Sequence, residues 1–569
     1  MLQNVLKRAI SCNRNFCQGQ WRQWKNPTQL RAASIASNGL SKVNRHHKPK
    51  AVNYDNFTRN DEETIYALSS GAGRAGIAVI RISGPACDDI CEGLCSELEK
   101  NLKPRYASVR TLYDPSDTTN VLDSQAVVIK LPAPRTQTGE DMVEFHVHGG
   151  NATVKAVLEG IAAVKSRHNI RYAEAGEFTR RGFTNGKLDL SQVEALSNQL
   201  SAETEQQRRA AVKGSSKYLG TLYESWRKSL LDARGEMEAL IDFSEDQHFD
   251  ESPAELLSGI SEKVRDMQKS IVQHEDASTR GELLRRGIRI SLLGAPNAGK
   301  SSLLNQIVGR EASIVSQEPG TTRDIVEVSL DIRGYLCTFA DTAGLRTEEN
   351  ATSAGVEATE HKISSIEQEG IRRAKAKASE SDLVIALASV EQSASSGKLE
   401  LKYDPEALSL AAAAPNSLIV INKWDLVPID KEDQLISKFK IHTEELTGPS
   451  TRIVMISCRE AESTKGERGG IDNLVEVLAT NFQGMTELRP DLQDLLGVTE
   501  RSRQLLVKTS ESLEAYLEEA SDESNEADIV IAAEHLRDAA QSLARITGKT
   551  VSDVEEVLGV VFEKFCVGK

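Results

Sequence analysis

The pattern of apolar and polar positions changes along the chain, and each change predicts a different kind of domain. Over 61–180, alternating runs such as "TIYALSSGAGRAGIAVIRISG" and "MVEFHVHGG" predict strands, and "ACDDICEGLCSEL" and "ATVKAVLEGIAAVKS" predict helices. Residues 181–286 and 487–569 have apolar positions at helical spacing with charged residues between them. Residues 287–486 alternate strand runs with helices, as in a doubly wound α/β domain. We therefore predict a multidomain α+β and α/β chain, in which an α/β domain is inserted into an all-α domain.

Local signals predict where some of these elements begin and where surface loops lie. Ser191 and Glu194 have the spacing of a capping box, which predicts a helix start at "SQVEAL". Two segments inside the α/β domain, 346–365 and 390–417, are polar or Ala-rich and have little apolar pattern. We predict that both segments are surface loops.

Cysteines and histidines of the first domain raise the question of a metal site. Cys87, Cys91 and Cys95 recur every fourth residue, which places them on one face of a helix. His146 and His148 lie on the same side of a predicted strand, without a third ligand nearby in sequence. Buried packing for the cysteines, and packing or hydrogen bonding for the histidines, are therefore favoured over metal binding.

Charge is distributed unevenly along the 569 residues, whose net charge is −15. The first fifty residues contain ten of the 69 Lys and Arg residues and no acidic residue, and the first carboxylate is Asp55. This composition predicts a mitochondrial targeting segment over 1–55, with a basic tail that contacts nucleic acid as the alternative. The remaining chain is acidic, so any contact with nucleic acid must be local or shared with a partner. No apolar run approaches the ~18 residues that a membrane-spanning helix needs.

The segment "IRISLLGAPNAGKSSLLNQIVG" has the pattern of a strand, a Gly-rich turn and a helix, and it contains GxxxxGK[ST]. Gly294 and Gly299 allow the backbone N–H groups to face phosphate at the positive end of the following helix. Lys300 would reach the β- and γ-phosphates, and the Ser301 hydroxyl would bind Mg²⁺. The strand and helix on either side supply the context that this motif requires.

Further nucleotide-binding motifs follow in order, and together they predict a GTPase. In "EPGTTRD", Thr322 can complete the Mg²⁺ shell, and in "DTAG", Asp341 can hold Mg²⁺ through water while the Gly344 N–H contacts the γ-phosphate. In "NKWD", the Asp425 carboxylate can accept from guanine N1–H and the exocyclic amine, which adenine cannot offer together. The "ISC" segment at 456–458 would present a backbone N–H to guanine O6. The predicted GTP contacts are Asn297, Ala298, Gly299, Lys300, Ser301, Ser302, Ser316, Thr321, Thr322, Asp341, Thr342, Ala343, Gly344, Asn422, Lys423, Asp425, Ser457 and Cys458.

The sequence resembles the family of tRNA-modifying GTPases called MnmE or TrmE in bacteria, in a mitochondrial version. The resemblance rests on "GRAGIAVIRISG", "TGEDMVEFHVHGG", "AGEFTRRGFTNGKLDLSQVEAL", "GAPNAGKSS", "GTTRD", "DTAGLR", "NKWD" and the terminal "FCVGK". It implies a Ras-like P-loop GTPase domain inserted into a helical domain. In the Ras type, a Gln after DTAG orients the attacking water, whereas Leu345 stands at that position here.

The resemblance implies how hydrolysis proceeds without that Gln. A K⁺ ion would lie beside the phosphates, with Asn297, Ser316, Glu318 and Thr321 as its ligands. Glu367, in "SIEQEGIRRA", would position the water, although a solvated helix charge is the alternative for this residue. The GTPase domains would pair with each other when GTP and K⁺ are bound.

The resemblance also implies that the first domain forms a homodimer and binds a tetrahydrofolate derivative, in the 5,10-methylene or 5-formyl form. Arg81, Glu144, Lys187 and Lys569 match positions that contact folate. Arg and Lys suit the oxygens of the pteridine and the glutamate tail, and a carboxylate suits the 2-amino-pyrimidine edge. Cys566 would lie beside this site, either as a nucleophile or only as a positioned thiol.

The implied reaction adds a carboxymethylaminomethyl or taurinomethyl group at C5 of the wobble uridine of mitochondrial tRNAs. The implied partner is an FAD-dependent protein resembling MnmG (GidA), which would provide most of the contact with tRNA. Mg²⁺ and K⁺ would be the metal cofactors, and GTP would be a substrate. The alternative is a regulatory or ribosome-assembly GTPase without modification chemistry, and folate binding by the first domain would distinguish the two.

Overall fold

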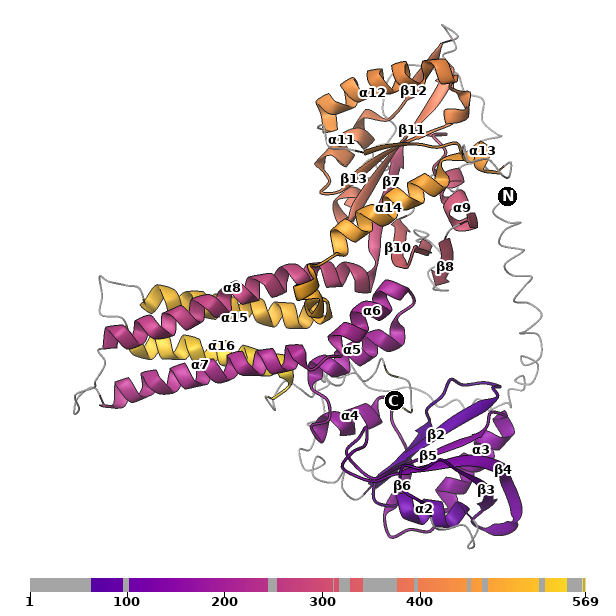
Figure 1. Cartoon of the computed structure of the whole chain (residues 1–569), viewed down its shortest axis with the longest axis vertical. Coiled ribbons are helices and arrows are strands. Elements are labelled where there is room, and N and C mark those ends of the chain that lie inside the picture. The colour runs from indigo at the N-terminus through magenta and orange to yellow at the C-terminus, as the bar shows by residue number, and fades with distance from the viewer. Residues whose placement is uncertain are drawn as a thin grey trace, which may run out of the picture. The chain divides into compact units, whose positions relative to one another are not determined.

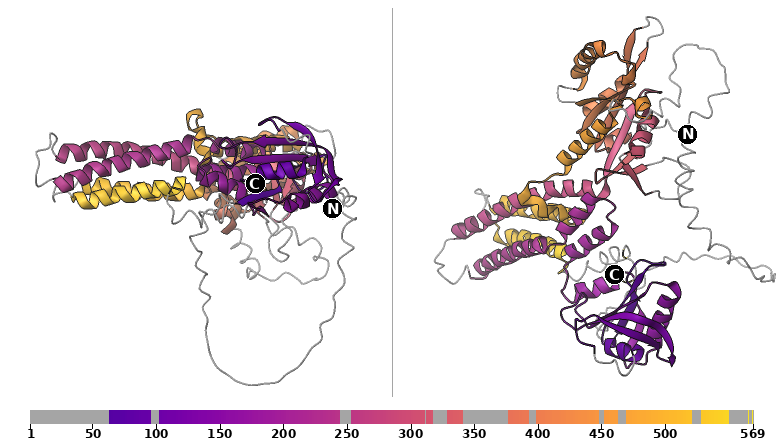
Figure 2. Two further views of the ribbon diagram at one scale, coloured as in Figure 1. Left: turned by 90° about the horizontal axis from the view of Figure 1, so that it is seen from below. Right: turned by 45° about the vertical axis from the view of Figure 1, so that its right-hand side comes forward.

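A computed structural model of the chain is shown in Figures 1 and 2. The chain divides into two units, Met1–Thr58 and Arg59–Lys569, and the predicted targeting segment over 1–55 lies outside the described residues. Among the described helices, none is both long and apolar enough to cross a membrane. The structure describes residues 63–95, 102–243, 253–310, 312–316, 328–340, 376–392, 398–447, 452–462, 469–520, 528–549, 565 and 568.

The first domain is built on a six-stranded sheet with the strand order β3-β4-β5-β2-β1-β6. One face of the sheet is buried against α2 and α3 through residues such as Val143, Phe145 and Val147. The strands and helices predicted from "TIYAL", "GIAVIRIS", "MVEFHVH", "ACDDICEGL" and "ATVKAVLEGIAA" are all present. Their bounds are β1 (Glu63–Leu68), β2 (Ile77–Ser83), α2 (Cys87–Leu94), β3 (Ser108–Asp114), β4 (Asp117–Leu131), β5 (Met142–His148), α3 (Asn151–Ala163) and β6 (Asn169–Tyr172).

The cysteine prediction is confirmed in this domain. Cys87 and Cys91 are buried on the inner face of α2, and Cys95 is buried at its C-cap. Burial raises the pKa of the Cys87 and Cys91 thiols, so both stay protonated and act as small apolar side chains. Among the described residues, no group of three or more His, Cys, Asp or Glu side chains could hold a metal ion.

The longest helices of the helical part, α7, α8, α15 and α16, pack side by side, as Figures 1 and 2 both show. α7, α8, α15 and α16 share one apolar core, although 283 positions of sequence separate members such as Tyr223 and Leu506. The bounds are α4 (Glu177–Thr184), α5 (Leu190–Ser201), α6 (Glu205–Gly214), α7 (Tyr218–Phe243), α8 (Pro253–Arg286), η6 (Pro490–Gly497), α15 (Glu500–Ala520) and α16 (Ile529–Thr547).

The predicted capping box at Ser191 and Glu194 is wrong. The N-cap of α5 is Asp189, whose carboxylate accepts from the Gln192 backbone N–H at 2.8 Å, while the Gln192 side chain accepts from the Asp189 N–H at 3.1 Å. The pairs Asp189–Gln192 and Ser191–Glu194 have the same spacing in the sequence. The Glu194 carboxylate forms an ion pair with Arg501, so only the Asp189–Gln192 pair forms the capping box.

The α/β domain has an eight-stranded sheet with the main order β14-β13-β11-β7-β10-β9-β8, and β12 pairs with β11. β14, β13, β11, β7 and β10 are parallel neighbours. Apolar cores lie on both faces of the sheet, as predicted for a doubly wound domain. The bounds are β7 (Ile288–Gly294), α9 (Lys300–Arg310), β8 (Ala312–Ser316), β9 (Val328–Ile332), β10 (Tyr335–Ala340), β11 (Leu383–Gln392), β12 (Leu399–Lys402), α11 (Pro405–Ala413), β13 (Ser417–Asn422), η3 (Trp424–Leu426), η4 (Ile429–Lys431), α12 (Glu432–Thr447), β14 (Arg452–Met455), α13 (Cys458–Glu462) and α14 (Ile471–Thr486).

The prediction that 390–417 is a surface loop is wrong. β12 pairs in antiparallel register with the end of β11, and α11 follows it directly. The Asp404 side chain caps α11 by accepting from two backbone N–H groups, and Pro405 occupies the first turn. Leu408 is buried in the core on that side of the sheet. The other predicted loop, 346–365, lies outside the described residues.

Candidate functional site

The phosphate loop connects the end of β7 to the start of α9, and its two glycines are required by close backbone approaches. Gly294 has φ 152°, and a Cβ atom there would lie 2.4 Å from the Leu387 carbonyl oxygen on β11. Gly299 has φ 99°, and its Cβ atom would lie 2.1 Å from Asn422 Nδ2. Asn297, at φ 62°, takes a left-handed conformation that Asn tolerates better than most residues. The loop can therefore present its backbone N–H groups to phosphate only with glycine at both positions.

The Lys300 side chain lies against this loop. Its Nζ donates to the carbonyl oxygens of Gly294 at 2.8 Å and Ala295 at 3.1 Å. Burial lowers the pKa of Lys300, because a charged ammonium is disfavoured where water is excluded. An incoming phosphate would supply the counter-charge at this position. Ser301 follows in the first turn of α9.

Asn422 joins the phosphate loop to the two segments predicted to recognise guanine. It is only 3% exposed. Its Nδ2 donates to the Ala298 carbonyl oxygen at 2.9 Å. Its Oδ1 accepts from the backbone N–H groups of Lys423 at 2.8 Å and Cys458 at 3.2 Å. One buried side chain thus fixes the ends of β7, β13 and β14 relative to each other.

Asp425, the carboxylate predicted to recognise guanine, is held by a neighbouring hydroxyl. Ser457 Oγ donates to Asp425 Oδ1 at 2.7 Å, and the Trp424 backbone N–H donates to the Ile456 carbonyl oxygen at 3.0 Å. Burial raises the pKa of Cys458 to about 12, so its thiol stays protonated. The arrangement orients a carboxylate at the carboxyl edge of the parallel strands, where doubly wound domains bind ligands.

In the first domain, the structure brings Arg81 and Glu144 together on the sheet face opposite α2 and α3. Arg81 Nε and Nη2 each lie 3.0 Å from Glu144 Oε1, and their side chains are 15% and 18% exposed. The guanidinium carbon lies 5.9 Å from the centre of the Phe178 ring. Arg81 Nη1 is buried and makes no hydrogen bond to any described residue. A buried donor of this kind is costly unless a ligand or water satisfies it.

Two protein-family models match the chain. One, described as "MnmE helical domain", matches residues 190–566. The other, described as "GTP-binding protein TrmE N-terminus", matches residues 64–187. The "tRNA modification GTPase MnmE" of Parvibaculum lavamentivorans is 40% identical over 507 residues, which cover 89% of this chain and 100% of the relative. The chain belongs to the MnmE family.

Mitochondrial proteins are among the similar relatives of this MnmE family member. The human protein named "5-taurinomethyluridine-[tRNA] synthase subunit GTPB3, mitochondrial" is 37% identical over 516 residues, covering 89% of this chain and 93% of the relative. The Schizosaccharomyces pombe protein named "tRNA modification GTPase mss1, mitochondrial" is 36% identical over 513 residues, covering 89% of this chain and 95% of the relative.

Some of the site residues expected in an MnmE protein lie close together in the structure, and others fall outside the described residues. The phosphate loop, including Ala298, and the first turn of α9, including Ser302, lie at one edge of the sheet. The same edge carries Asn422, Lys423, Asp425, Ser457 and Cys458. Of Ser316, only the backbone at the end of β8 is described. Outside the described residues lie Glu318, Thr321, Thr322, Asp341, Thr342, Ala343, Gly344, Glu367, Cys566 and Lys569.

Lys187 is placed by its contact with a glycine turn. Its Cε atom lies 2.9 Å from where a Cβ atom of Gly139 would stand, so the Lys187 side chain lies against Gly139. Among the described residues, Arg81 and Glu144 are the predicted folate contacts that form an ion pair.

The terminal "FCVGK" segment contacts the end of β1 through Gly568. The Ser69 hydroxyl donates to the Gly568 carbonyl oxygen at 2.7 Å. Gly568 has φ 98°, and a Cβ atom there would lie 2.2 Å from the Leu68 carbonyl oxygen. Phe565 is buried against Leu190 and Val193 of α5. The described residues of the tail are therefore held at defined positions.

Two groups at these sites were not predicted from the sequence. Glu391, at the end of β11, lies with Oε1 3.2 Å from Lys423 Nζ. The parallel register of β11 with β13, which places Ser389 opposite Asn422, brings Glu391 to this edge of the sheet, and no sequence motif marks it. Arg181 is only 1% exposed and contacts the Glu63 carbonyl oxygen, Glu140 and Glu177. No local pattern distinguishes such a buried arginine from an exposed one.

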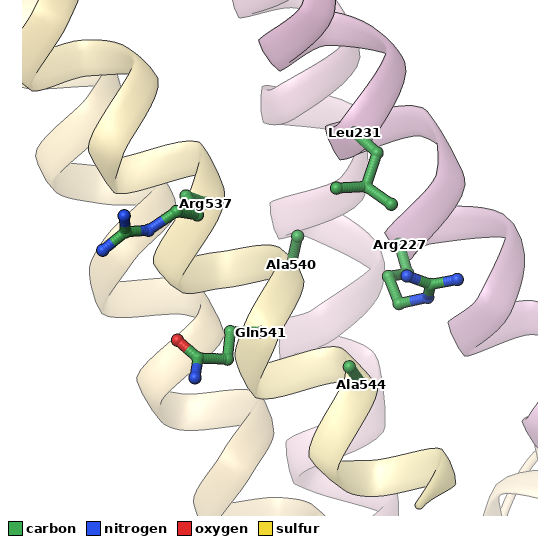
Figure 3. A pocket seen from close by; sticks show the side chains of 6 residues that line it. All are labelled: Arg227, Leu231, Arg537, Ala540, Gln541 and Ala544. Carbon is green, nitrogen blue, oxygen red and sulfur yellow. The ribbon is translucent and has the colours of Figure 1, made fainter. Parts of the chain in front are cut away.

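A groove between α7 and α16 is separate from these sites (Figure 3). Figure 3 shows two arginines at its borders and small or apolar side chains between them. None of its lining residues has a carboxylate or a nucleophilic side chain. The lining residues are Arg227, Leu231, Arg537, Ala540, Gln541 and Ala544.

Proposed function

We propose that this chain is a K⁺-activated mitochondrial GTPase that takes part in modification of the wobble uridine of tRNA at C5. A flavin-dependent partner resembling MnmG shares the reaction, and a tetrahydrofolate derivative supplies one carbon. The observation that supports the nucleotide half most strongly is the buried Asn422 side chain, which links the phosphate loop to both guanine-recognition segments.

The nucleotide-binding residues have distinct tasks in this proposal. Backbone N–H groups of the phosphate loop and Lys300 Nζ bind the β- and γ-phosphates, and Asp425 accepts from two guanine donors. The donor set also fits two cations. The Ser301 hydroxyl, in the first turn of α9, would hold Mg²⁺ together with Thr322 and, through water, Asp341. The exposed amide of Asn297 would bind K⁺ by its oxygen, with Ser316, Glu318 and Thr321.

Hydrolysis then requires a group that orients water, because Leu345 cannot do so. We assign this task to Glu367. K⁺ would supply positive charge beside the phosphates, where an arginine finger acts in other GTPases. Pairing of two GTPase domains completes the site.

The first domain fits a pterin at the Arg81–Glu144 pair. The buried Arg81 Nη1, which has no hydrogen-bond partner among the described residues, can donate to a ligand oxygen. The Glu144 carboxylate can accept from an amino-pyrimidine edge. Lys187 and Lys569 would hold the acidic tail, and Cys566 stays a prediction for a nucleophile or a positioned thiol. The bound folate supplies a one-carbon unit, while these residues bind and orient it within a homodimer.

Location in mitochondria is supported by two observations. Four eukaryotic relatives have names that say mitochondrial, and the first fifty residues are basic and contain no acid. Nucleoside analysis of mitochondrial tRNA after removal of the protein tests the proposal as a whole. We expect the wobble uridines to lose their C5 modification, and unchanged modification would support a regulatory GTPase instead.

Phosphate release in K⁺ and in Na⁺ tests the hydrolysis mechanism separately. We expect hydrolysis to depend on K⁺, and we expect Glu367→Ala to keep GTP affinity while losing hydrolysis by about 10²-fold or more. Equal rates in Na⁺ would contradict the K⁺ assignment, and normal turnover of Glu367→Ala would mean that another residue positions the water.

A further inference from the structure

A histidine and a buried carboxylate form a pair at the end of β5, on the same sheet face as Arg81 and Glu144. His148 Nδ1 lies 2.9 Å from Oδ1 and 3.1 Å from Oδ2 of Asp123. The His148 backbone N–H also donates to Asp123 Oδ2, at 2.8 Å. The Asp123 side chain is 1% exposed, whereas the His148 side chain is 63% exposed. The carboxylate is thus enclosed, and the imidazole reaches out from it.

Asp123 fixes the orientation and the proton position of this imidazole. Its carboxylate also accepts from the Gln125 backbone N–H at 3.0 Å. Burial raises the pKa of Asp123, but the hydrogen bonds from the Gln125 and His148 N–H groups outweigh burial, and the pKa is lowered overall. An ionised carboxylate at Nδ1 places the imidazole proton on Nδ1 and leaves Nε2 for exchange with a ligand. Proton-transferring histidines in enzymes are oriented in this way.

The backbone hydrogen bonds at His148 would form with almost any side chain at this position, so the imidazole is not required to hold the end of β5 in place. Any residue except proline could supply the N–H that bonds Asp123 Oδ2. The next residue, Gly149, is clamped by Ala75 and Gly76, whose backbone groups bond its own at 3.0 and 3.3 Å. The His148 ring therefore adds an oriented, exposed nitrogen to a strand end that other hydrogen bonds already hold.

The pair is aligned with the candidate pterin site along β5. Glu144, His146 and His148 alternate with the buried core residues of β5 and so share one face. Their partners on β2 are Arg81, Val79 and Ile77. Four residues of strand separate Glu144 from His148, which is about 13 Å at roughly 3.3 Å per residue.

Glu144, His146 and His148 form a row along β5, and the sheet surface beside this row suits an extended, flat ligand. His146 Nε2 lies 3.4 Å from Glu144 Oε2, which continues the polar row toward His148. Ile77, opposite His148, is 64% exposed and offers an apolar surface beside the imidazole. A ligand held at one end by Arg81 can therefore extend along β5 to the imidazole.

We propose that His148, oriented by Asp123, exchanges a proton with the amine nitrogen that joins the pterin, held by Arg81 and Glu144, to the rest of the folate. This inference rests on the folate part of the proposed function. With the ring proton held on Nδ1, the Nε2 lone pair of His148 takes a proton from the protonated ligand amine. The ligand N–H bond breaks as an N–H bond forms at Nε2, and the reverse transfer from the resulting imidazolium restores both groups. Asp123 remains deprotonated throughout and acts as a positioning residue. His148 is then a catalytic residue of the one-carbon step.

The test uses the full-length chain and the variants His148→Gln and Asp123→Asn, with His168→Gln as the matched control. His168 lies in the same domain, and its Nε2 contacts Arg167 Nε at 3.0 Å instead of a carboxylate. We expect His148→Gln to bind 5-formyltetrahydrofolate within about twofold of the unmodified chain. Its yield of modified tRNA with the flavoprotein partner should fall by about 10²-fold or more, as expected for loss of a general acid or base. The control should retain full yield.

A second measurement does not depend on turnover. In ¹⁵N-histidine spectra, adding 5-formyltetrahydrofolate should shift the His148 Nε2 signal, which the His148→Gln spectrum identifies by its loss. Asp123→Asn should change the His148 tautomer while folate still binds. Full modification by His148→Gln, or no shift of the Nε2 signal when folate binds, would overturn the inference. Failure of the unmodified chain to bind folate would instead overturn the folate part of the proposed function.

Discussion

The substitution Gly299→Ala tests the phosphate loop directly, because the structure defines what the added methyl group would meet. The Cβ atom would lie 2.1 Å from Asn422 Nδ2, and the residue would keep φ 99° only under strain. Strain of this kind costs about 1–3 kcal/mol. Displacing the Asn422 side chain would also remove its hydrogen bond to Ala298, which costs about 1–3 kcal/mol for buried groups.

Both costs apply to the loop conformation that binds phosphate. The free energy of GTP binding should therefore become less favourable by about 2–6 kcal/mol, which raises the Kd by roughly 30-fold or more. Fluorescence titration with a labelled guanine nucleotide measures this change. Gly484→Ala is the matched control, because Gly484 lies in α14 with nothing within 4 Å of an added Cβ. In a helix interior, Ala is favoured over Gly by about 1 kcal/mol, so the control should bind GTP normally and unfold at slightly higher temperature. Normal GTP affinity of Gly299→Ala would refute the reasoning.

Three further predictions concern guanine recognition and the buried charges. Asp425→Asn should weaken GTP binding while xanthosine triphosphate, which offers a carbonyl in place of the amine, binds better; unchanged GTP affinity would exclude the guanine assignment. Arg181→Met should destabilise the chain by about 3–5 kcal/mol in urea unfolding, because Glu140 and Glu177 lose a buried partner. Arg208→Gln, at an exposed pair, is the control and should leave the urea midpoint nearly unchanged. Burial raises the pKa of Glu177, but hydrogen bonds from Arg171 and the Glu174 N–H outweigh burial and lower the pKa overall. The ionised Glu177 therefore stabilises the folded chain fully above its unfolded pKa of about 4.3, and this contribution is lost as pH falls through its folded pKa. Thermal unfolding in acid should show this loss, and a Glu177→Gln variant with an equally steep acid dependence would contradict it.

Features that depend on local sequence were predictable from the sequence. The strand, turn and helix around the phosphate loop follow from an apolar run, two glycines and a helical pattern within about twenty residues. The strands of the first domain follow from their period-two alternation, which β5 keeps in its burial pattern. Asp425 could be identified because its motif directly follows the apolar strand β13.

Features that depend on distant partners were not predictable. The segment 390–417 resembles a loop until β11 provides a pairing partner for β12. The cap of α5 was assigned two residues too late, because overlapping Asp189 and Ser191 patterns fit the same rule and Arg501 decides between them. The Asp123–His148 pair joins residues 25 apart whose contact depends on the register of β4 and β5.

The most direct test of the central claim is mass spectrometry of nucleosides from mitochondrial tRNA of cells that lack this protein. The account predicts that the C5 modification of the wobble uridine is lost and that it returns with the intact chain but not with Gly299→Ala. Wobble uridines that keep their full C5 modification in the absence of the protein would contradict it.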